Sequence, residues 1–293
     1  MRSGFVSIVG RPNVGKSSLI NAIVDEKIAI VSNVAGTTRN TIQGVYHDDD
    51  TQIVFVDTPG VQKAMDKLGK HLNKQAYEAL EDIDAILFVV DAAAGLGKGD
   101  MFIMEALKHT SVPVILVLNK IDKLTREGIL KVICEYKDLF NFADIIPVSA
   151  KEVDNVDRLI DLTKNYLKDS IKYYDDDITS SNDKLFMISE LVREKILNLT
   201  NDEVPHSITC VLTSFQEKTS LASISVDIIV SRDSLKRIII GKQGSMLKQI
   251  GIEARKDIEN MLGKTVYLEL FVKTVKNWRN KEKYLVELGF DEL

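Results

Sequence analysis

The residues with the clearest chemical potential lie at positions 10–17, where Gly-Arg-Pro-Asn-Val-Gly-Lys-Ser matches the pattern G-x-x-x-x-G-K-[ST]. An apolar run ending at Val9 precedes this motif, and a helical pattern begins at Lys16. Its glycines let backbone N–H groups converge on phosphate oxygens, and the helix N-terminus adds partial positive charge. The pattern predicts a phosphate-binding loop in which Lys16 reaches the β- and γ-phosphates and the Ser17 hydroxyl binds Mg²⁺.

A second motif, Asp-Thr-Pro-Gly at Asp57 to Gly60, closes the apolar run Gln52–Val56. A carboxylate at the carboxyl end of a strand beside a phosphate loop can hold Mg²⁺ through water, and the Gly60 N–H can sense the γ-phosphate. The loop at residues 35–40 carries two threonines. A threonine hydroxyl there could complete the Mg²⁺ shell only with GTP bound, which predicts a switch loop released by hydrolysis.

The third motif, Asn119-Lys120-Ile121-Asp122, selects the base. Guanine presents two N–H donors that the Asp122 carboxylate can accept as a bidentate pair. Adenine has no such donors and would leave the carboxylate unpaired. The Lys120 stem can pack on the ring face. Asn and Asp also favour strand-to-helix turns, so the preceding phosphate loop is what favours a guanine site.

A last short motif, Ser149-Ala150-Lys151, follows another strand pattern, and its backbone N–H groups would meet O6 of guanine. Three residues are a weak signal alone, but the order of all the motifs is that of the small GTPase-like proteins. We therefore expect GTP or GDP with Mg²⁺ as the bound cofactors.

One expected residue is missing, because Val61 follows Asp-Thr-Pro-Gly where Ras-like GTPases carry a glutamine that orients the attacking water. Valine cannot hydrogen-bond, so we predict slow intrinsic hydrolysis. One candidate replacement is K⁺, since Asn13 resembles the asparagine that supports a potassium site in a group of bacterial GTPases. The other reading is that Asn13 only shapes the turn.

The elements that must position these motifs alternate between strands and helices, which indicates an α/β P-loop NTPase fold with a mostly parallel six-stranded sheet and helices on both faces. The predicted strands are Phe5–Val9, Gln43–His47, Gln52–Val56, Ala85–Val90, Val114–Leu118 and Asp144–Pro147. The predicted helices are Lys16–Val24, Lys67–Leu80, Asp100–Lys108, Glu127–Tyr136 and Val156–Leu167.

The length of 293 residues suggests two domains. We expect a GTP-binding domain over residues 1–170, a linker over 171–183 and an α+β domain over 184–293. The net charge is −5, but the segment Arg232–Lys283 holds 13 Lys or Arg against 6 Asp or Glu, a balance of +7 that leaves −12 for the rest. A basic second domain behind an acidic first one indicates a polyanionic partner.

The basic domain contains a Gly-X-X-Gly turn, Gly241 to Gly244, between two helical patterns and ahead of a strand pattern. This is the signature of a KH domain, and the strand patterns ahead of the turn match the type II arrangement. Glycines let the backbone lie against a sugar-phosphate chain, and we expect the apolar stretch Ile238–Ile240 to form one side of a groove for unstacked bases. The residues predicted to bind RNA are Ile240, Gly241, Lys242, Gln243, Gly244, Lys248 and Arg255.

The last predicted helix, Asn277–Leu288, mixes basic and aromatic residues. Such a mixture suits RNA, but an amphipathic cap on the domain core explains Trp278 better. The same basic helix could also contact an anionic membrane surface, although no strong apolar face accompanies its charges.

Taken together, the motifs at residues 10–17, 37–39, 57–60, 119–122 and 149–151, with the Ile-Ile-Gly-Lys-Gln-Gly turn, resemble the Era family of bacterial GTPases over nearly the whole chain. The resemblance implies binding of the 3′ end of 16S rRNA, a role in maturing the 30S subunit, and loose association with the inner membrane. It also implies Thr38 as the Mg²⁺ ligand from the threonine pair, and hydrolysis as a release timer.

The predicted site can now be stated in full. We expect catalytic roles for Lys16, Thr38 and Gly60, and Mg²⁺ ligation by Ser17, Thr38 and Asp57. The residues predicted to bind the nucleotide are Gly10, Arg11, Pro12, Asn13, Val14, Gly15, Lys16, Ser17, Ser18, Asp57, Gly60, Asn119, Lys120, Asp122, Ser149, Ala150 and Lys151.

Two other functions remain open. A tRNA-modification or large-subunit GTPase would need a second GTP-binding domain or a catalytic domain with a modification cysteine, and neither is apparent. A membrane-linked switch would use the basic domain to bind lipid or protein. Because the two cysteines lie far apart and neither a signal peptide nor a spanning segment is apparent, we expect a cytoplasmic location, at most peripheral to the inner face of the membrane. We also expect a monomer.

Overall fold

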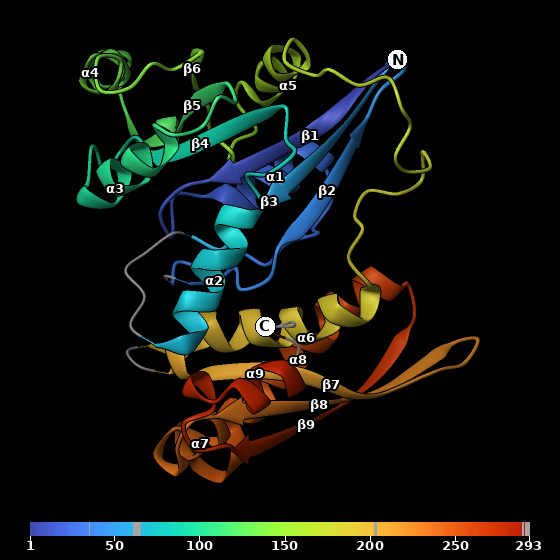
Figure 1. The fold of residues 1–293 in the computed structure, drawn as a ribbon. Coiled ribbons are helices and arrows are strands. Elements are labelled where there is room, and N and C mark those ends of the chain that lie inside the picture. Colours follow the sequence, from blue (N-terminus) through green and yellow to red (C-terminus); the bar gives the residue numbers. More distant parts are fainter. Residues whose placement is uncertain (35, 61–65, 202–203, 289, 291–293) are drawn as a thin grey trace. The chain divides into compact units, whose positions relative to one another are not determined.

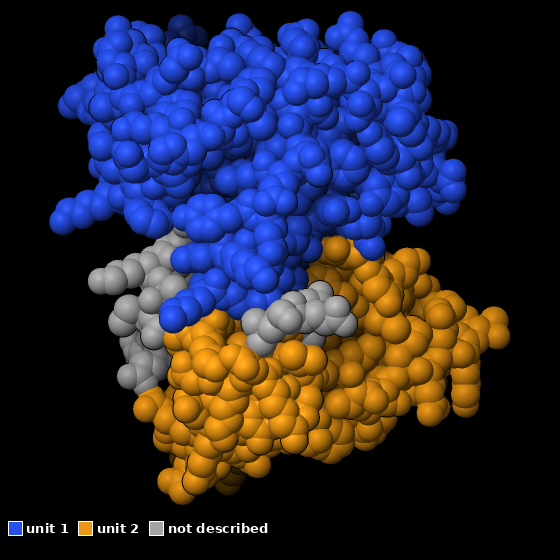
Figure 2. All heavy atoms as spheres, viewed as in Figure 1, with its two compact units in different colours: residues 1–31, 35–64, 69–181 blue, residues 32–34, 65–68, 182–293 orange. Residues whose placement is uncertain are grey.

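The computed structural model describes residues 1–293 except 35, 61–65, 202–203, 289 and 291–293. The chain divides into two compact units (Figure 2). The first comprises residues 1–31, 35–64 and 69–181, and the second comprises residues 32–34, 65–68 and 182–293. None of the helices in the described ranges is both long and apolar enough to cross a bilayer.

The first unit has the predicted alternation of strands and helices (Figure 1). Its strands are β1 (Arg2–Val9), β2 (Ile42–His47), β3 (Thr51–Asp57), β4 (Ala85–Asp91), β5 (Val114–Asn119) and β6 (Asp144–Pro147). Its helices are α1 (Lys16–Val24), most of α2 (Lys67–Glu78), α3 (Lys98–Leu107), α4 (Arg126–Tyr136) and α5 (Val156–Lys164). The predicted six-stranded fold is confirmed.

These strands form one sheet in the order β2-β3-β1-β4-β5-β6, in which only the β2–β3 pair is antiparallel. The apolar strands are buried on both faces because alternate residues face opposite cores. In β5, Ile115 and Val117 belong to one core cluster, while Leu116 and Leu118 belong to the other. Parallel pairing brings the carboxyl ends of five strands, with the motifs that follow them, to one edge of the sheet.

The segment expected to be a linker, residues 171–183, is mostly bound to the first unit. Val45 N donates to Thr179 O (2.8 Å) and Ser181 N donates to Gln43 O (3.3 Å), so the chain pairs with the outer edge of β2. The side chain of Gln52 is fully buried; its amide nitrogen donates to Tyr174 O (2.8 Å). The segment predicted to be a linker is therefore held to the first unit by backbone hydrogen bonds.

The second unit is an α+β domain built on a three-stranded sheet of order β7-β8-β9, with β7 antiparallel and β9 parallel to β8. Its elements are α6 (Lys184–Leu199), β7 (Ile208–Glu217), β8 (Leu221–Val230), α7 (Asp233–Ile240), α8 (Ser245–Leu262), β9 (Thr265–Thr274) and α9 (Glu282–Glu287). One hydrophobic cluster joins α6, α7 and α8 to the sheet.

The last helix is shorter than predicted. Asn277 is in the left-handed region (φ 56°), so a single 3₁₀ turn, Trp278–Asn280, stands before α9 begins at Glu282. Trp278 is fully buried and stacks on Phe290 with ring centroids 5.8 Å apart. Trp278 therefore belongs to the packing of the domain rather than to a base-stacking surface.

Candidate functional site

The phosphate loop joins β1 to α1 in the predicted position. Gly15 has φ 98°, and a Cβ atom there would lie 2.3 Å from the side-chain nitrogen of Asn119. That nitrogen donates to Val14 O (2.8 Å). Glycine is required at position 15 because the base-selecting motif packs directly on the loop, and this contact joins the phosphate and base parts of the site.

The side chain of Lys16 lies inside the loop. It is buried, and its Nζ donates to Gly10 O (3.3 Å) and Arg11 O (3.5 Å). Burial lowers the pKa of Lys16, while the negative charge of Asp57 opposes that change. An ammonium group held by loop carbonyls is placed to bind phosphate oxygens in their stead.

The three predicted Mg²⁺ ligands come together from three separate segments. Ser17 Oγ lies 2.8 Å from Thr38 Oγ1 and donates to Asp57 Oδ2 at 2.8 Å. Burial raises the pKa of Asp57 to about 6, against the opposing effects of the Lys16 charge and the Ser17 hydrogen bond.

The donor set fits Mg²⁺, a hard cation that prefers oxygen ligands. Asp57 is fully buried, and its Oδ1 atom has no hydrogen-bond partner among the residues that the structure describes. A buried carboxylate oxygen without a partner is costly unless something compensates for it. These two hydroxyls and this carboxylate thus form a set of oxygen donors that could hold the cation, and a bound cation would compensate Asp57 Oδ1.

The base-selecting motif is built as an interlocked pair of loops. Asn119 Oδ1 accepts hydrogen bonds from Lys120 N (2.8 Å) and Ala150 N (3.0 Å). Ser149 Oγ donates to Asp122 Oδ1 at 2.7 Å. Ser149 and Ala150 thus position the motif side chains, and the Ala150 N–H that was expected to meet guanine O6 is bound to Asn119 in this structure.

Sequence reasoning missed Asp91, the last residue of β4. Lys120 Nζ donates to Asp91 Oδ2 (2.7 Å) and to Asn13 O (2.6 Å). The available signal was a carboxylate at the end of a buried apolar strand, the same position that drew attention to Asp57. Asp91 was overlooked because no named motif surrounds it.

Arg11 occupies the loop, but its side chain is directed away from the phosphate position. Its Nε lies 3.1 Å from Asp100 Oδ1, and its Nη2 donates to Gly95 O (3.2 Å). Asp100 is fully buried and also accepts a hydrogen bond from Tyr136 OH (3.2 Å). Arg11 can therefore offer only its backbone to a nucleotide, and its guanidinium joins the loop to α3.

The remaining predicted residues lie at the edges of the site. Pro12 contacts Gly60, where a Cβ atom would lie 2.9 Å from Pro12 N. Ser18 is half-buried, and Lys151 is exposed with its Nζ 2.6 Å from Glu152. Val61, which stands where Ras-like GTPases carry the water-orienting glutamine, lies outside the described residues.

In the second unit, the Gly-X-X-Gly turn stands between α7 and α8. Gly241 (φ 73°) is required because a Cβ atom would lie 2.8 Å from Met246 N, whereas a Cβ at Gly244 (φ 79°) would meet no described atom within 4 Å. Lys242 and Gln243 are exposed at the tip. The backbone at Gly244 can thus be approached closely by a ligand.

A groove of about 450 Å³ runs beside this turn, between α8 and β9. Three of the predicted RNA-binding residues line it, namely Gly244, Lys248 and Arg255. Its other lining residues are Leu247, Gly251, Ile252, Val266, Tyr267, Leu268 and Leu270. Of these, Tyr267 is exposed and aromatic, and sequence reasoning missed it because β9 follows the motif by twenty residues or so.

The expectation that Ile238–Ile240 would form a wall of the groove differs from the structure. Ile239 is fully buried in the core, Ile240 packs partly buried against that core, and Ile238 is 49% exposed. The apolar wall comes from α8 and β9 instead, because the α7 stretch is needed to hold the helix on its sheet.

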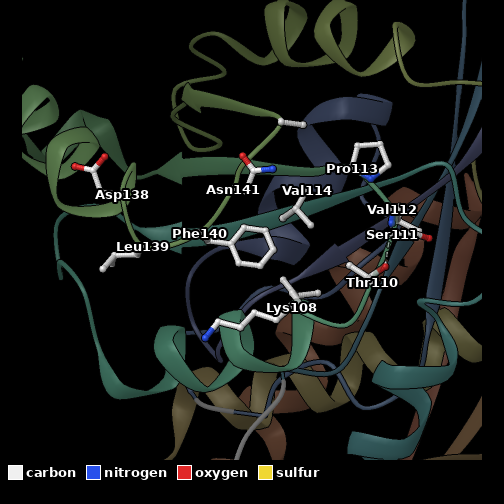
Figure 3. A pocket seen from close by; sticks show the side chains of 12 residues that line it. Lys108, Thr110, Ser111, Val112, Pro113, Val114, Asp138, Leu139, Phe140 and Asn141 are labelled. Carbon is white, nitrogen blue, oxygen red and sulfur yellow. Dashed lines mark hydrogen bonds between the residues drawn. The ribbon is translucent and has the colours of Figure 1, made fainter.

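A second hollow, of about 740 Å³, lies in the first unit at the amino ends of β5 and β6 (Figure 3). The nucleotide motifs follow the carboxyl ends of the strands, at the opposite edge of the sheet. Its lining comes mainly from the segments that precede β5 and β6, including Lys108, Thr110, Asp138 and Asn141. No predicted site residue is among the lining side chains, so this hollow has no part in the nucleotide site.

Comparison with known proteins agrees with the two-unit description. Residues 5–120 match the family model of the 50S ribosome-binding GTPase, and residues 203–279 match the KH domain. The second match confirms the KH fold predicted from the Gly-X-X-Gly turn.

Solved structures provide matches over the full length. One is a variant of Era from Aquifex aeolicus bound to GDP·AlF₄⁻, with 38% identity, a TM-score of 0.96 and complete coverage of both chains. Another is Era in complex with MgGDPNP and nucleotides 1506–1542 of 16S ribosomal RNA, with the same identity, TM-score and coverage.

Proposed function

The chain belongs to the Era family of GTPases and is therefore a GTP hydrolase, and we propose that it uses its nucleotide state to control binding of the 3′ region of 16S rRNA during maturation of the 30S subunit. We place this activity in the cytoplasm and assign it to a monomer. The observation that supports the proposal is that one chain combines the Ser17–Thr38–Asp57 cluster and the Ser149–Asp122 pair with a groove beside an open Gly-X-X-Gly turn.

In the nucleotide site, Ser17, Thr38 and Asp57 would hold Mg²⁺, which neutralises charge on the β- and γ-phosphates when it is bound. Lys16 would bind phosphate oxygens from within the loop, and the Gly60 N–H would bind the γ-phosphate. Asp122, held by Ser149, would accept both guanine donors. Thr38 lies in the loop before β2, so loss of the γ-phosphate removes a reason for that loop to stay ordered.

In the KH domain, the exposed Lys242 and the backbone of Gly241 and Gly244 would hold the sugar-phosphate chain. Lys248 and Arg255 add positive charge along the groove. The exposed ring of Tyr267 offers a surface on which an unstacked base can lie. RNA is thereby bound through its backbone at the turn and through its bases in the groove.

The RNA assignment is tested by binding a 3′-terminal 16S rRNA fragment in the presence of GDPNP or GDP. We expect a nucleotide-dependent affinity, a large loss in the Gly241→Asp/Gly244→Asp double variant, and a fall of about one in the salt-dependence slope for Lys242→Ala. Lys218→Ala, in the exposed β7–β8 turn, is the matched control. Unchanged affinity in the double-glycine variant contradicts the assignment.

The same protein is assayed on anionic lipid vesicles. If the vesicles bind with the same dependence on Lys242 and the RNA fragment does not bind, the second domain serves a membrane and not RNA.

Asn13 supplies a separate test of how water is activated without a glutamine. We propose that K⁺ beside the phosphates stabilises developing charge, as an arginine finger does in other GTPases. We expect faster turnover in KCl than in NaCl, and loss of that difference in Asn13→Ala. Equal rates in both salts contradict the potassium proposal.

A further inference from the structure

The end of β4 carries a carboxylate that belongs to none of the GTPase motifs. Asp91 pairs in register with Asn119 of the neighbouring parallel strand. Asn119 is the first residue of the base-selecting motif, so Asp91 lies beside that motif. We propose that Asp91 is a positioning residue of the guanine pocket, which acts by fixing the side chain of Lys120. The inference rests on the GTP-binding part of the proposed function and is independent of RNA.

The carboxylate of Asp91 is itself held rigidly. Its Oδ1 accepts from the backbone N–H groups of Ala93 and Ala94, both at 3.1 Å, and its Oδ2 accepts from Lys120 Nζ at 2.7 Å. The Asp91 side chain is 17% exposed and that of Lys120 is 26% exposed, so the ion pair is partly shielded from water. Two backbone donors orient one oxygen, which leaves the other directed at the lysine.

Lys120 connects this anchor to the phosphate loop. Its Nζ also donates to Asn13 O at 2.6 Å, and its Cε lies 3.9 Å from the position of a Cβ on Gly15. Lys120 and Asn13 both have left-handed backbones, with φ 65° and 67°. The lysine stem therefore runs along the loop to an ammonium group that two oxygens hold, and it can form one wall for the base.

A lysine side chain has several freely rotating bonds, and ordering it costs free energy. Asp91 orders Lys120 before the nucleotide arrives, so that binding does not include this cost. Without the carboxylate, the ammonium keeps only the Asn13 carbonyl as a partner among the contacts described above. We expect GDP affinity to fall by about tenfold in Asp91→Ala.

Two substitutions separate positioning from a local structural role. Asp91→Asn retains a side-chain oxygen for Ala93 N and Ala94 N but presents an uncharged amide to Lys120. Lys120→Met retains an apolar stem but has no ammonium. Affinity for GDP with Mg²⁺ is measured by calorimetry on the full chain for each single variant and for the double variant, with thermal unfolding recorded alongside.

We expect Asp91→Asn to lose most of the affinity that Asp91→Ala loses while unfolding near the wild-type temperature. In the Lys120→Met background, the same substitution should change affinity by less than about twofold, because the partner through which it acts is gone. The matched control is Asp84→Asn, at the opposite end of β4, whose carboxylate accepts from Phe5 N (3.0 Å) and should leave GDP affinity unchanged.

An equal loss in both backgrounds, or wild-type affinity in Asp91→Asn, overturns the inference. If the wild-type chain itself does not bind GDP, the failure lies with the proposed function and not with Asp91.

Discussion

Single side chains in the nucleotide site depend on neighbours that hold them. Asp122 accepts from Ser149, Asn119 is fixed by Ala150, and Ser17 is oriented by Asp57. Each motif residue thus has a polar partner from another segment, which reduces the number of side-chain conformations that a ligand must select. The proposed roles of these residues in base specificity and metal binding therefore each rest on a pair of residues.

Asp122→Asn is expected to exchange the base preference. The amide places a donor opposite a guanine donor, which should weaken GTP binding by on the order of a hundredfold or more. Xanthine, with a carbonyl in place of the 2-amino group, should instead gain affinity. Titration with GTP and XTP checks this outcome, and equal weakening for both nucleotides would argue against direct contact between Asp122 and the base.

A second residue pair makes the stability of the first unit depend on pH. Burial alone would raise the pKa of Asp48, but the hydrogen bond from Lys164, with Nζ 2.6 Å from Oδ2, contributes to lowering it to about 2. Because the folded-state pKa lies below the unfolded value of 3.8, the stabilisation is present above about pH 4 and is lost as the pH falls towards 2.

We expect Asp48→Asn to lower the free energy of unfolding by about 1 kcal/mol at pH 7, after allowance for partial exposure. The substitution should also remove part of the acid sensitivity between pH 4 and 2. Urea unfolding at several pH values measures both effects, with Asp49→Asn as the exposed control. A constant difference between the variant and wild type at all pH values would contradict the assignment.

At the scale of elements, the edge of the sheet is completed by a segment that is neither helix nor strand. Residues 173–181 lie alongside β2. Gln52 of β3 binds the first two of these residues through three hydrogen bonds. Its Oε1 accepts from Tyr173 N (2.7 Å) and Tyr174 N (3.0 Å), and its Nε2 donates to Tyr174 O (2.8 Å). One buried side chain thus satisfies the backbone at the point where the segment meets the sheet.

Gln52→Ala should therefore release this segment from the sheet. Loss of a buried amide with three partners is expected to cost about 2–3 kcal/mol of unfolding free energy. Hydrogen exchange at Tyr173 and Tyr174 should increase, while exchange in β5 should follow only the global change. Unchanged protection at the two tyrosines would show that other contacts hold the segment.

Some elements of the first unit could be predicted from the sequence, and others could not. Strands such as β4 and β5 and the motif loops were predictable because apolar runs and glycines constrain the chain locally. Residues 171–181 were not, because their Asp- and Ser-rich composition has no apolar period and their pairing depends on a glutamine more than a hundred positions away. Asp91 was missed because no named motif surrounds it, and only the fold brings it to its partner Lys120.

At the scale of the whole molecule, the two units have separate hydrophobic cores. The residues of the proposed nucleotide site all belong to the first unit. A ligand that binds only the folded first unit stabilises that unit by mass action. The second unit should not share this stabilisation unless the two unfold together.

Differential scanning calorimetry of the full chain should accordingly show two transitions, of which GDP with Mg²⁺ raises only one. At a free ligand concentration about 100 times the Kd, the stabilisation is about 2.7 kcal/mol. Asp122→Ala, which should not bind the nucleotide, serves as the control. A single transition that shifts as a whole would show that the units unfold cooperatively.

The pairing along β2 also determines at which residue a soluble fragment of the first unit can end. An uncovered outer strand presents unpaired N–H and C=O groups that can recruit a strand from another molecule, which is a common route to aggregation. In this chain, Thr179 and Ser181 cover that row on β2. A fragment ending at residue 170 would expose it, whereas one ending at residue 181 would carry its own protection, so the solubility of the fragment depends on these eleven residues.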